Sequence, residues 1–134
     1  MNIYCIGNAA VKGDDVPSQL VPFLQQAFPE SDIHSVDPTE TFTPEKHSIL
    51  IDSVVGIDHV CIYSDIDAFV TSKRISVHDF DLGLHLQLLK KIHKLPTIWI
   101  IGVPQFAVAD SVISDVIGLV NKTQIQASEV RRWR

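Results

Sequence analysis

The segment Ser48-Ile49-Leu50-Ile51-Asp52 decides the fold expected for this chain of 134 residues. It is short and apolar on both faces, which is typical of a strand buried in a parallel sheet rather than of a strand with one face in water. The segment ends on the carboxylate of Asp52. A carboxylate at the end of a buried strand must find hydrogen-bond donors or a cation, because burying it alone is expensive.

Apolar segments of the same kind recur along the chain and alternate with helical patterns. Four further strands are expected, at Asn2–Ile6, Asp32–Val36, His59–Tyr63 and Thr97–Ile101. Helices are expected around Leu20–Phe28, from Asp79 through Ile92, and over Val108–Val120, whereas residues 66–78 are expected to be mostly loop. This alternation predicts an α/β fold: a three-layer sandwich with a mostly parallel central sheet of about five strands flanked by helices.

The composition excludes several classes of protein. With 11 Lys and Arg against 16 Asp and Glu, the net charge is −5, which argues against a general nucleic-acid binder. The longest uncharged stretch, Leu95–Ala109, contains two prolines and is too short to span a membrane. The first residues do not resemble a secretory signal. Cys5 and Cys61 lie in apolar runs, so we expect buried, reduced thiols in a cytoplasmic protein.

The length fits one domain, and no linker divides the chain. We expect a single domain over residues 1–134, in which residues 122–134 form a polar, basic C-terminal tail ending in Arg131-Arg-Trp-Arg134. No large exposed apolar face is evident in the sequence. We therefore expect a monomer.

Acidic residues and a histidine are expected to meet at one edge of the sheet, because ligands of open α/β sheets bind at the carboxyl ends of the strands. Asp14 and Asp15 follow the first strand, Asp52 ends the third, and His78 precedes the long helix. Two carboxylates and an imidazole from separate segments form a three-ligand site for a divalent transition metal such as nickel, zinc, iron or manganese.

Each of these residues also has a purely structural interpretation. Asp15 precedes a helix that begins near Pro17, so it is equally suited to cap that helix. Asp52 could be satisfied by the amides of a neighbouring loop, and His78 could be an ordinary loop residue before the helix cap Asp79. Both interpretations stay open at this point.

Two other kinds of site have no support in the sequence. Gly7-Asn8 lacks the further glycines of a dinucleotide-binding loop. No Gly-x-Ser-x-Gly motif is present, and both cysteines lie within expected strands rather than at a strand-to-helix turn. Catalysis by a serine or cysteine nucleophile is therefore not expected.

Several short motifs occur in an order that resembles the nickel–iron hydrogenase maturation endopeptidases. The similarity covers residues 3–105 and consists of five segments: Cys5-Ile-Gly-Asn8 with Gly13-Asp-Asp15, Ser35-Val-Asp37, Leu50-Ile-Asp52-Ser-Val, Ile75-Ser-Val-His78 before a leucine-rich helix, and Ile100-Ile-Gly-Val-Pro-Gln105. Each motif is short, and their ordered combination carries the resemblance.

The resemblance implies an activity and a role for each matching residue. Members of this family remove a short C-terminal peptide from the nickel-loaded precursor of the hydrogenase large subunit. Asp15, Asp52 and His78 would then bind nickel that belongs to the precursor, so the isolated protein is not expected to hold nickel tightly. Asp37 would lie near the cleft and contribute to catalysis or substrate positioning, although Asp37-Pro38 is also typical of a turn.

Two local differences from the family motivate alternatives. The acidic pair is followed by Val16-Pro17 rather than Gly-Val-Gly, and Asp37 is followed by Pro-Thr-Glu40 rather than by two glycines. One alternative is a relative that checks for nickel or holds the precursor without cleaving it. Another is a metallohydrolase acting on small substrates, which would hold its own zinc.

Overall fold

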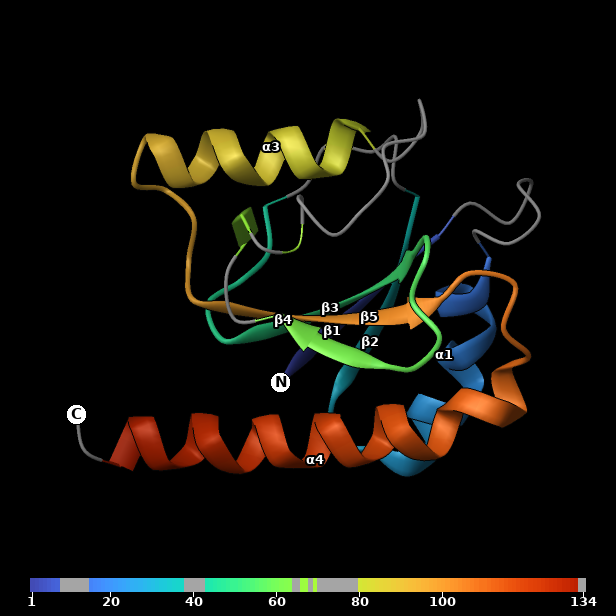
Figure 1. The fold of residues 1–134 in the computed structure, drawn as a ribbon. Helices are drawn as coiled ribbons and strands as arrows, with labels where there is room; N and C mark the ends of the chain where they lie inside the picture. The colour runs from blue at the N-terminus through green and yellow to red at the C-terminus, as the bar shows by residue number, and fades with distance from the viewer. Residues whose placement is uncertain (8–14, 38–42, 64–65, 68, 70–79, 133–134) are drawn as a thin grey trace.

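The computed structural model describes residues 1–7, 15–37, 43–63, 66–67, 69 and 80–132 (Figure 1). Its centre is a five-stranded sheet with the order β2-β1-β3-β5-β4, in which every neighbouring pair is parallel except β4 and β5. The strands are β1 (Asn2–Ile6), β2 (Asp32–Val36), β3 (Ser48–Val54), β4 (Cys61–Tyr63) and β5 (Ile98–Pro104). The helices are α1 (Val16–Ala27), α3 (Phe80–Lys91) and α4 (Ala109–Arg132).

The helices cover the sheet in two layers, α1 and α4 on one face and α3 on the other (Figure 1). Side-chain direction alternates along β3: Ile49 and Ile51 pack with α1 and α4, whereas Leu50 and Val54 pack on the side of α3. This confirms the expected three-layer α/β sandwich with a mostly parallel sheet. Both faces of β3 are buried because helices cover the sheet from both sides.

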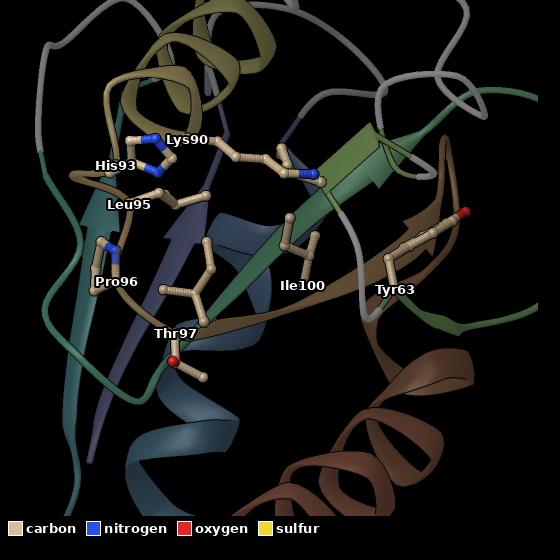
Figure 2. Close-up of a pocket in the computed structure, with 9 residues that line it drawn as sticks. Tyr63, Lys90, His93, Leu95, Pro96, Thr97 and Ile100 are labelled. Carbon is tan, nitrogen blue, oxygen red and sulfur yellow. The ribbon is translucent and has the colours of Figure 1, made fainter.

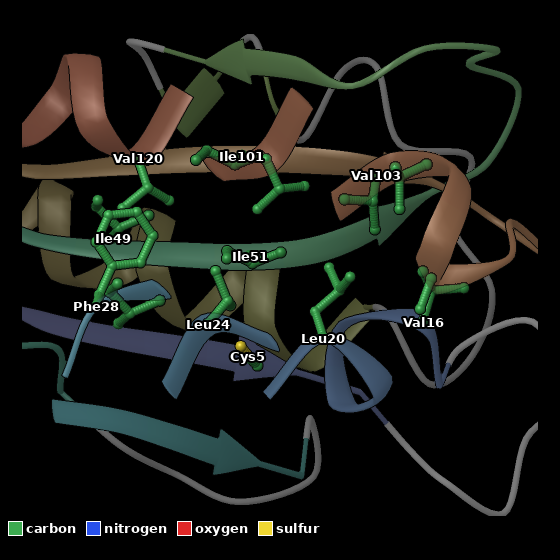
Figure 3. Close-up of a cluster of buried hydrophobic side chains, with 14 residues drawn as sticks. Cys5, Val16, Leu20, Leu24, Phe28, Ile49, Ile51, Ile101, Val103 and Val120 are labelled. Carbon is green, nitrogen blue, oxygen red and sulfur yellow. The ribbon is translucent and has the colours of Figure 1, made fainter. Parts of the chain in front are cut away.

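Two hydrophobic clusters follow from this arrangement. The α1/α4 cluster fills the space beneath those two helices (Figure 3) and comprises Ile3, Cys5, Val16, Leu20, Leu24, Phe28, Ile49, Ile51, Ile101, Val103, Ala109, Val112, Val116 and Val120. The α3 cluster lies on the opposite face and comprises Ile6, Val36, Leu50, Val54, Ile66, Phe69, Leu86 and Ile100. The sheet therefore separates two distinct cores.

The segment expected to form a polar C-terminal tail is helical as far as Arg132, because α4 continues without interruption to that residue. Thr123 and Ala127 are buried and continue, at helical spacing, the buried stripe that includes Val120. The Thr123 hydroxyl donates a hydrogen bond to the Leu119 carbonyl at 2.8 Å, which satisfies its polar atom inside the helix. Because this stretch is mostly polar and its buried side chains are small, the sequence pattern did not indicate its buried face.

The prediction that residues 66–78 are mostly loop is wrong for the three of these residues that the structure describes. Ile66, Asp67 and Phe69 are helical, and the side chains of Ile66 and Phe69 are buried in the α3 cluster. Residues 70–79 lie outside the described part of the chain. No helix among the described residues is long and apolar enough to cross a membrane.

Candidate active site

Asp52 is a buried carboxylate near the carboxyl end of the central strand β3. Its side chain is 2% exposed, and it faces α3 because it shares the strand parity of Leu50 and Val54. The backbone N–H of Ser53 donates a hydrogen bond to Asp52 Oδ1 at 2.9 Å. This contact orients the carboxylate, and its donor belongs to β3 itself rather than to the neighbouring loop that the structural interpretation of Asp52 proposed.

Asp15 lies on the same edge of the sheet, in the segment that follows β1 and leads into α1. It occupies the N-cap position of α1, but its side chain makes no capping hydrogen bond. Its Oδ2 instead accepts a hydrogen bond from Gln19 Nε2 at 2.8 Å, one helical turn further on. Capping therefore does not account for the half-buried Asp15 carboxylate, although its backbone begins the helix as the sequence suggested.

Asp37 directly follows β2 and is half-buried. The β1–β2 pairing extends to this point, because the Gly7 N–H donates to the Val36 carbonyl at 3.1 Å. Strand β1 lies between β2 and β3, so the backbones at Asp37 and Asp52 are separated by two strand spacings, about 10 Å. Asp37 therefore belongs to the same edge as Asp52 and Asp15.

His78 and Asp14 lie outside the described residues. Helix α3 begins at Phe80, on the side of the sheet where β3 and β5 end (Figure 1). Within the described ranges, no three His, Cys, Asp or Glu side chains gather into a group that could hold a metal ion. The triad of Asp15, Asp52 and His78 therefore stays a prediction. Two of these residues, Asp15 and Asp52, lie at the expected edge of the sheet.

Gly102 and Tyr63 form a close contact beside Asp52 that the sequence analysis missed. Gly102 of β5 is the register partner of Asp52, and a Cβ atom at Gly102 would lie 2.8 Å from both Tyr63 Cε2 and Val54 Cγ2. The Tyr63 ring is held edge-on by Phe69, with ring centroids 5.6 Å apart. Glycine is therefore required here so that the Tyr63 ring can lie over β5.

The sequence held one signal for this contact, a glycine inside an apolar strand, which indicates close approach of another group. Figure 2 shows the Tyr63 hydroxyl pointing away from the cavity drawn there, toward the end of β5. Tyr63 therefore contributes its ring to the packing beside Asp52 and directs its phenol toward the edge that carries the carboxylates.

The two cysteines differ in environment. Cys5 is fully buried, and burial raises the pKa of its thiol to about 12. Cys61 is only half-buried, which corrects the expectation that both thiols are buried, and its Sγ lies 3.5 Å from the His59 carbonyl oxygen. A thiol with so high a pKa supplies almost no thiolate at neutral pH, so Cys5 is not a nucleophile.

Comparison with solved structures shows that the fold is that of hydrogenase maturation endopeptidases. The hydrogenase maturating endopeptidase HybD from E. coli matches with a TM-score of 0.74 at 16% identity, covering 94% of this chain and 92% of its own. An endopeptidase from E. coli, solved in solution, matches with a TM-score of 0.72 at 18% identity, covering 95% and 94%. The [NiFe] hydrogenase maturation protease HybD from Thermococcus kodakarensis matches with a TM-score of 0.66 at 16% identity, covering 90% and 96%.

Comparison by sequence finds no matching protein family and no matching curated protein. The structural likeness nevertheless covers nearly the whole of each chain, so it concerns the complete fold rather than a shared substructure. The family resemblance expected from the ordered motifs is thus confirmed at the level of the fold. Fold alone does not fix chemistry, which depends on the residues at the site.

Proposed function

We propose that this protein is an endopeptidase that removes the C-terminal peptide from the nickel-loaded precursor of a nickel–iron hydrogenase large subunit. The observation that carries the proposal is the coincidence of two independent features. The fold matches solved maturation endopeptidases over 94% of the chain, and Asp52 is a buried carboxylate near the end of its central strand. Burying a carboxylate is costly, so a buried Asp at this place marks a candidate functional site.

In this proposal Asp15, Asp52 and His78 bind the nickel of the precursor. Carboxylate and imidazole ligands suit a borderline divalent metal, and three of them leave positions open for groups of the substrate. The nickel is part of the substrate, so it tells the enzyme that the precursor has been loaded. The contact from Ser53 N–H to Asp52 Oδ1 holds one ligand oriented in advance.

Asp37 is proposed to act on the peptide rather than on the metal. It lies on the same edge as Asp52, and the end of β1 lies between them. A carboxylate at this place is suited to orient the scissile peptide or to accept a proton from the attacking water. The free, buried thiol of Cys5 is consistent with the reducing environment of the cytoplasm, where we propose the protein acts.

The test is incubation of the protein with nickel-loaded and nickel-free forms of a large-subunit precursor, with the mass of the large subunit as readout. The expected result is loss of a C-terminal peptide from the nickel-loaded form alone. Asp52→Asn preserves an acceptor for Ser53 N–H but removes the charge, and we expect it to slow cleavage by about a hundredfold or more. His78→Ala is expected to have an effect of similar size.

Asp115→Asn is the matched control, because Asp115 is exposed on α4 and its loss changes the net charge equally. It should cleave at the wild-type rate. Normal cleavage by His78→Ala would remove that residue from the site. An intact precursor that nevertheless associates with the protein in a nickel-dependent manner would favour the nickel-checking alternative. Stoichiometric zinc in the purified protein would favour the metallohydrolase.

A further inference from the structure

A second surface feature lies at the opposite end of α3 from the candidate active site. A cavity of about 440 Å³ opens between the last turn of α3 and the beginning of β5 (Figure 2). Helix α3 has 12 residues, so its two ends are about 18 Å apart. The cations of the groove therefore lie at the end of α3 away from Asp15, Asp37 and Asp52. The lining of the groove also includes Tyr63, whose ring packs beside Asp52.

The groove combines an apolar floor with a cationic rim. The floor is formed by side chains from β5 and the segments beside it, namely Ile66, Leu95, Ile98 and Ile100. Lys90 and His93 border it on the side of α3, and Figure 2 shows both above the apolar residues. Lys91 and Lys94, next to them in sequence, are exposed.

The backbone at the end of α3 leaves these lysine side chains available. His93 has a φ of 58°, and the N–H groups of His93 and Lys94 donate to the carbonyls of Lys90 and Leu89, at 3.1 and 2.8 Å. This is the Schellman arrangement, in which the backbone itself satisfies the last carbonyls of the helix. The left-handed turn at His93 also brings the imidazole to the rim of the groove.

The local charge differs in sign from that of the whole chain. Lys90 Nζ pairs with Asp67 Oδ2 at 2.7 Å, so that lysine is largely balanced. Lys91 and Lys94 remain as an excess of positive charge beside the groove, in a chain whose net charge is −5. Lys46 also lies close by, because its neighbour His47 donates a backbone hydrogen bond to the Thr97 carbonyl at 2.7 Å, but it is next to the exposed Glu45 and so adds no net charge.

We propose that this groove is a docking site for an acidic peptide segment of a partner protein, one that carries an apolar side chain between carboxylates. The apolar floor suits the apolar side chain, and the lysines complement the carboxylates. A nucleic acid is a poorer occupant because so few cations would neutralise only a few phosphates. The inference does not depend on endopeptidase activity.

The experiment measures binding of a short peptide that alternates leucine and glutamate, with a leucine–glutamine peptide as its neutral counterpart. Isotope-labelled protein reports the binding site through the amide shifts of residues 90–100. We expect the acidic peptide alone to shift these amides, and added salt to weaken its binding. The double variant Lys91→Gln/Lys94→Gln should lower the affinity by about fivefold, since exposed charge pairs contribute modestly.

Lys122→Gln is the matched control, because Lys122 is exposed on α4, which covers the other face of the sheet. It should leave the affinity unchanged. The proposal is overturned if the neutral peptide binds equally well, if the shifts fall elsewhere, or if Lys122→Gln weakens binding as much as the double variant. Tighter binding of a single-stranded oligonucleotide to the same amides would also overturn it. None of these outcomes bears on cleavage of a precursor.

Discussion

The two faces of the sheet differ in what they bury. Beneath α1 and α4 lies a closed hydrophobic cluster with Cys5 among its members, and Thr123, a buried polar side chain of α4, is uncharged. The α3 face buries Asp52, the acidic residue among the buried polar side chains of the described residues. The close contact between Gly102 and Tyr63 lies on the same face. The α1/α4 face stabilises the fold by burying apolar side chains, whereas the α3 face also buries the carboxylate of Asp52. That division is common in enzymes, whose sites are less stable than their cores.

The largest expected difference between the faces is chemical. Cys5, on the α1/α4 side, has a pKa of about 12, three units above the ordinary value of 9.0, so its thiolate is about a thousandfold scarcer than that of an unshifted thiol. Iodoacetamide should therefore modify half-buried Cys61 in the native protein and leave Cys5 unmodified. Mass spectrometry of peptides would show this, and equal labelling in denaturant is the control. Early labelling of Cys5 would mean that this face opens readily.

Removing apolar volume from the closed face should be the most costly change in stability. Leu24→Ala deletes buried methyl groups from a fully buried position of α1, and we expect it to lower the free energy of unfolding by about 3 kcal/mol. Urea denaturation measures the effect. Leu88→Ala makes the same chemical change on α3, where Leu88 is 57% exposed, and should cost less than about 0.5 kcal/mol. Equal losses would contradict the assignment of the core.

A methyl group added on the other face tests the packing beside Asp52. Gly102→Ala should lower the free energy of unfolding by about 2 kcal/mol, because its Cβ would lie 2.8 Å from atoms of Tyr63 and Val54. It should also slow precursor cleavage, since the displaced groups adjoin Asp52. Gly118→Ala is the matched control: nothing lies within 4 Å of a Cβ there, and alanine favours the helix. We therefore expect it to stabilise the protein slightly.

The Lys90–Asp67 pair on the α3 side should have the smallest effect. The hydrogen bond from Lys90 holds the pKa of exposed Asp67 below its ordinary value. The contribution of the pair to the free energy of unfolding is therefore fully present above the pKa of about 4 that the carboxyl group has in the unfolded chain. It is lost as the pH falls through the lower pKa of the folded protein. Asp67→Asn should remove this dependence in unfolding curves measured below pH 4, with little change at pH 7. A large loss at pH 7 would show that the pair holds α3 in place.

The sequence predicted most of the fold because its strands are short apolar runs with distinct ends. The strand at Asp32–Val36 agrees with β2 in both bounds, whereas β3 and β5 extend further than expected, to Val54 and Pro104. The polar residues Asp52 and Ser53 ended the apolar run although both are buried, and so concealed the end of β3. The last turns of α4 were missed for a related reason, because Thr123 and Ala127 form a buried stripe without large apolar residues.

The candidate site was only partly accessible to sequence reasoning. Asp15 and Asp52 could be assigned to one edge because parallel strands align their carboxyl ends, whereas Asp37 was placed near them only by the family resemblance. The structure has all three at that edge. Gly102 indicated a close contact in the sequence, but Tyr63 could not be identified as its partner because the contact depends on β4 lying antiparallel beside β5. The groove at the end of α3 depends on the left-handed turn at His93, a conformation that is uncommon for any residue other than glycine.

The place of α4 in the chain has a consequence for biosynthesis. This helix follows all five strands, yet Val112, Val116 and Val120 cover a face of the sheet that β1, β3 and β5 have already formed. On the ribosome, the part of this face that α1 does not cover therefore stays exposed until α4 has been translated. Apolar surface exposed in this interval is what chaperones recognise and what drives aggregation of nascent chains.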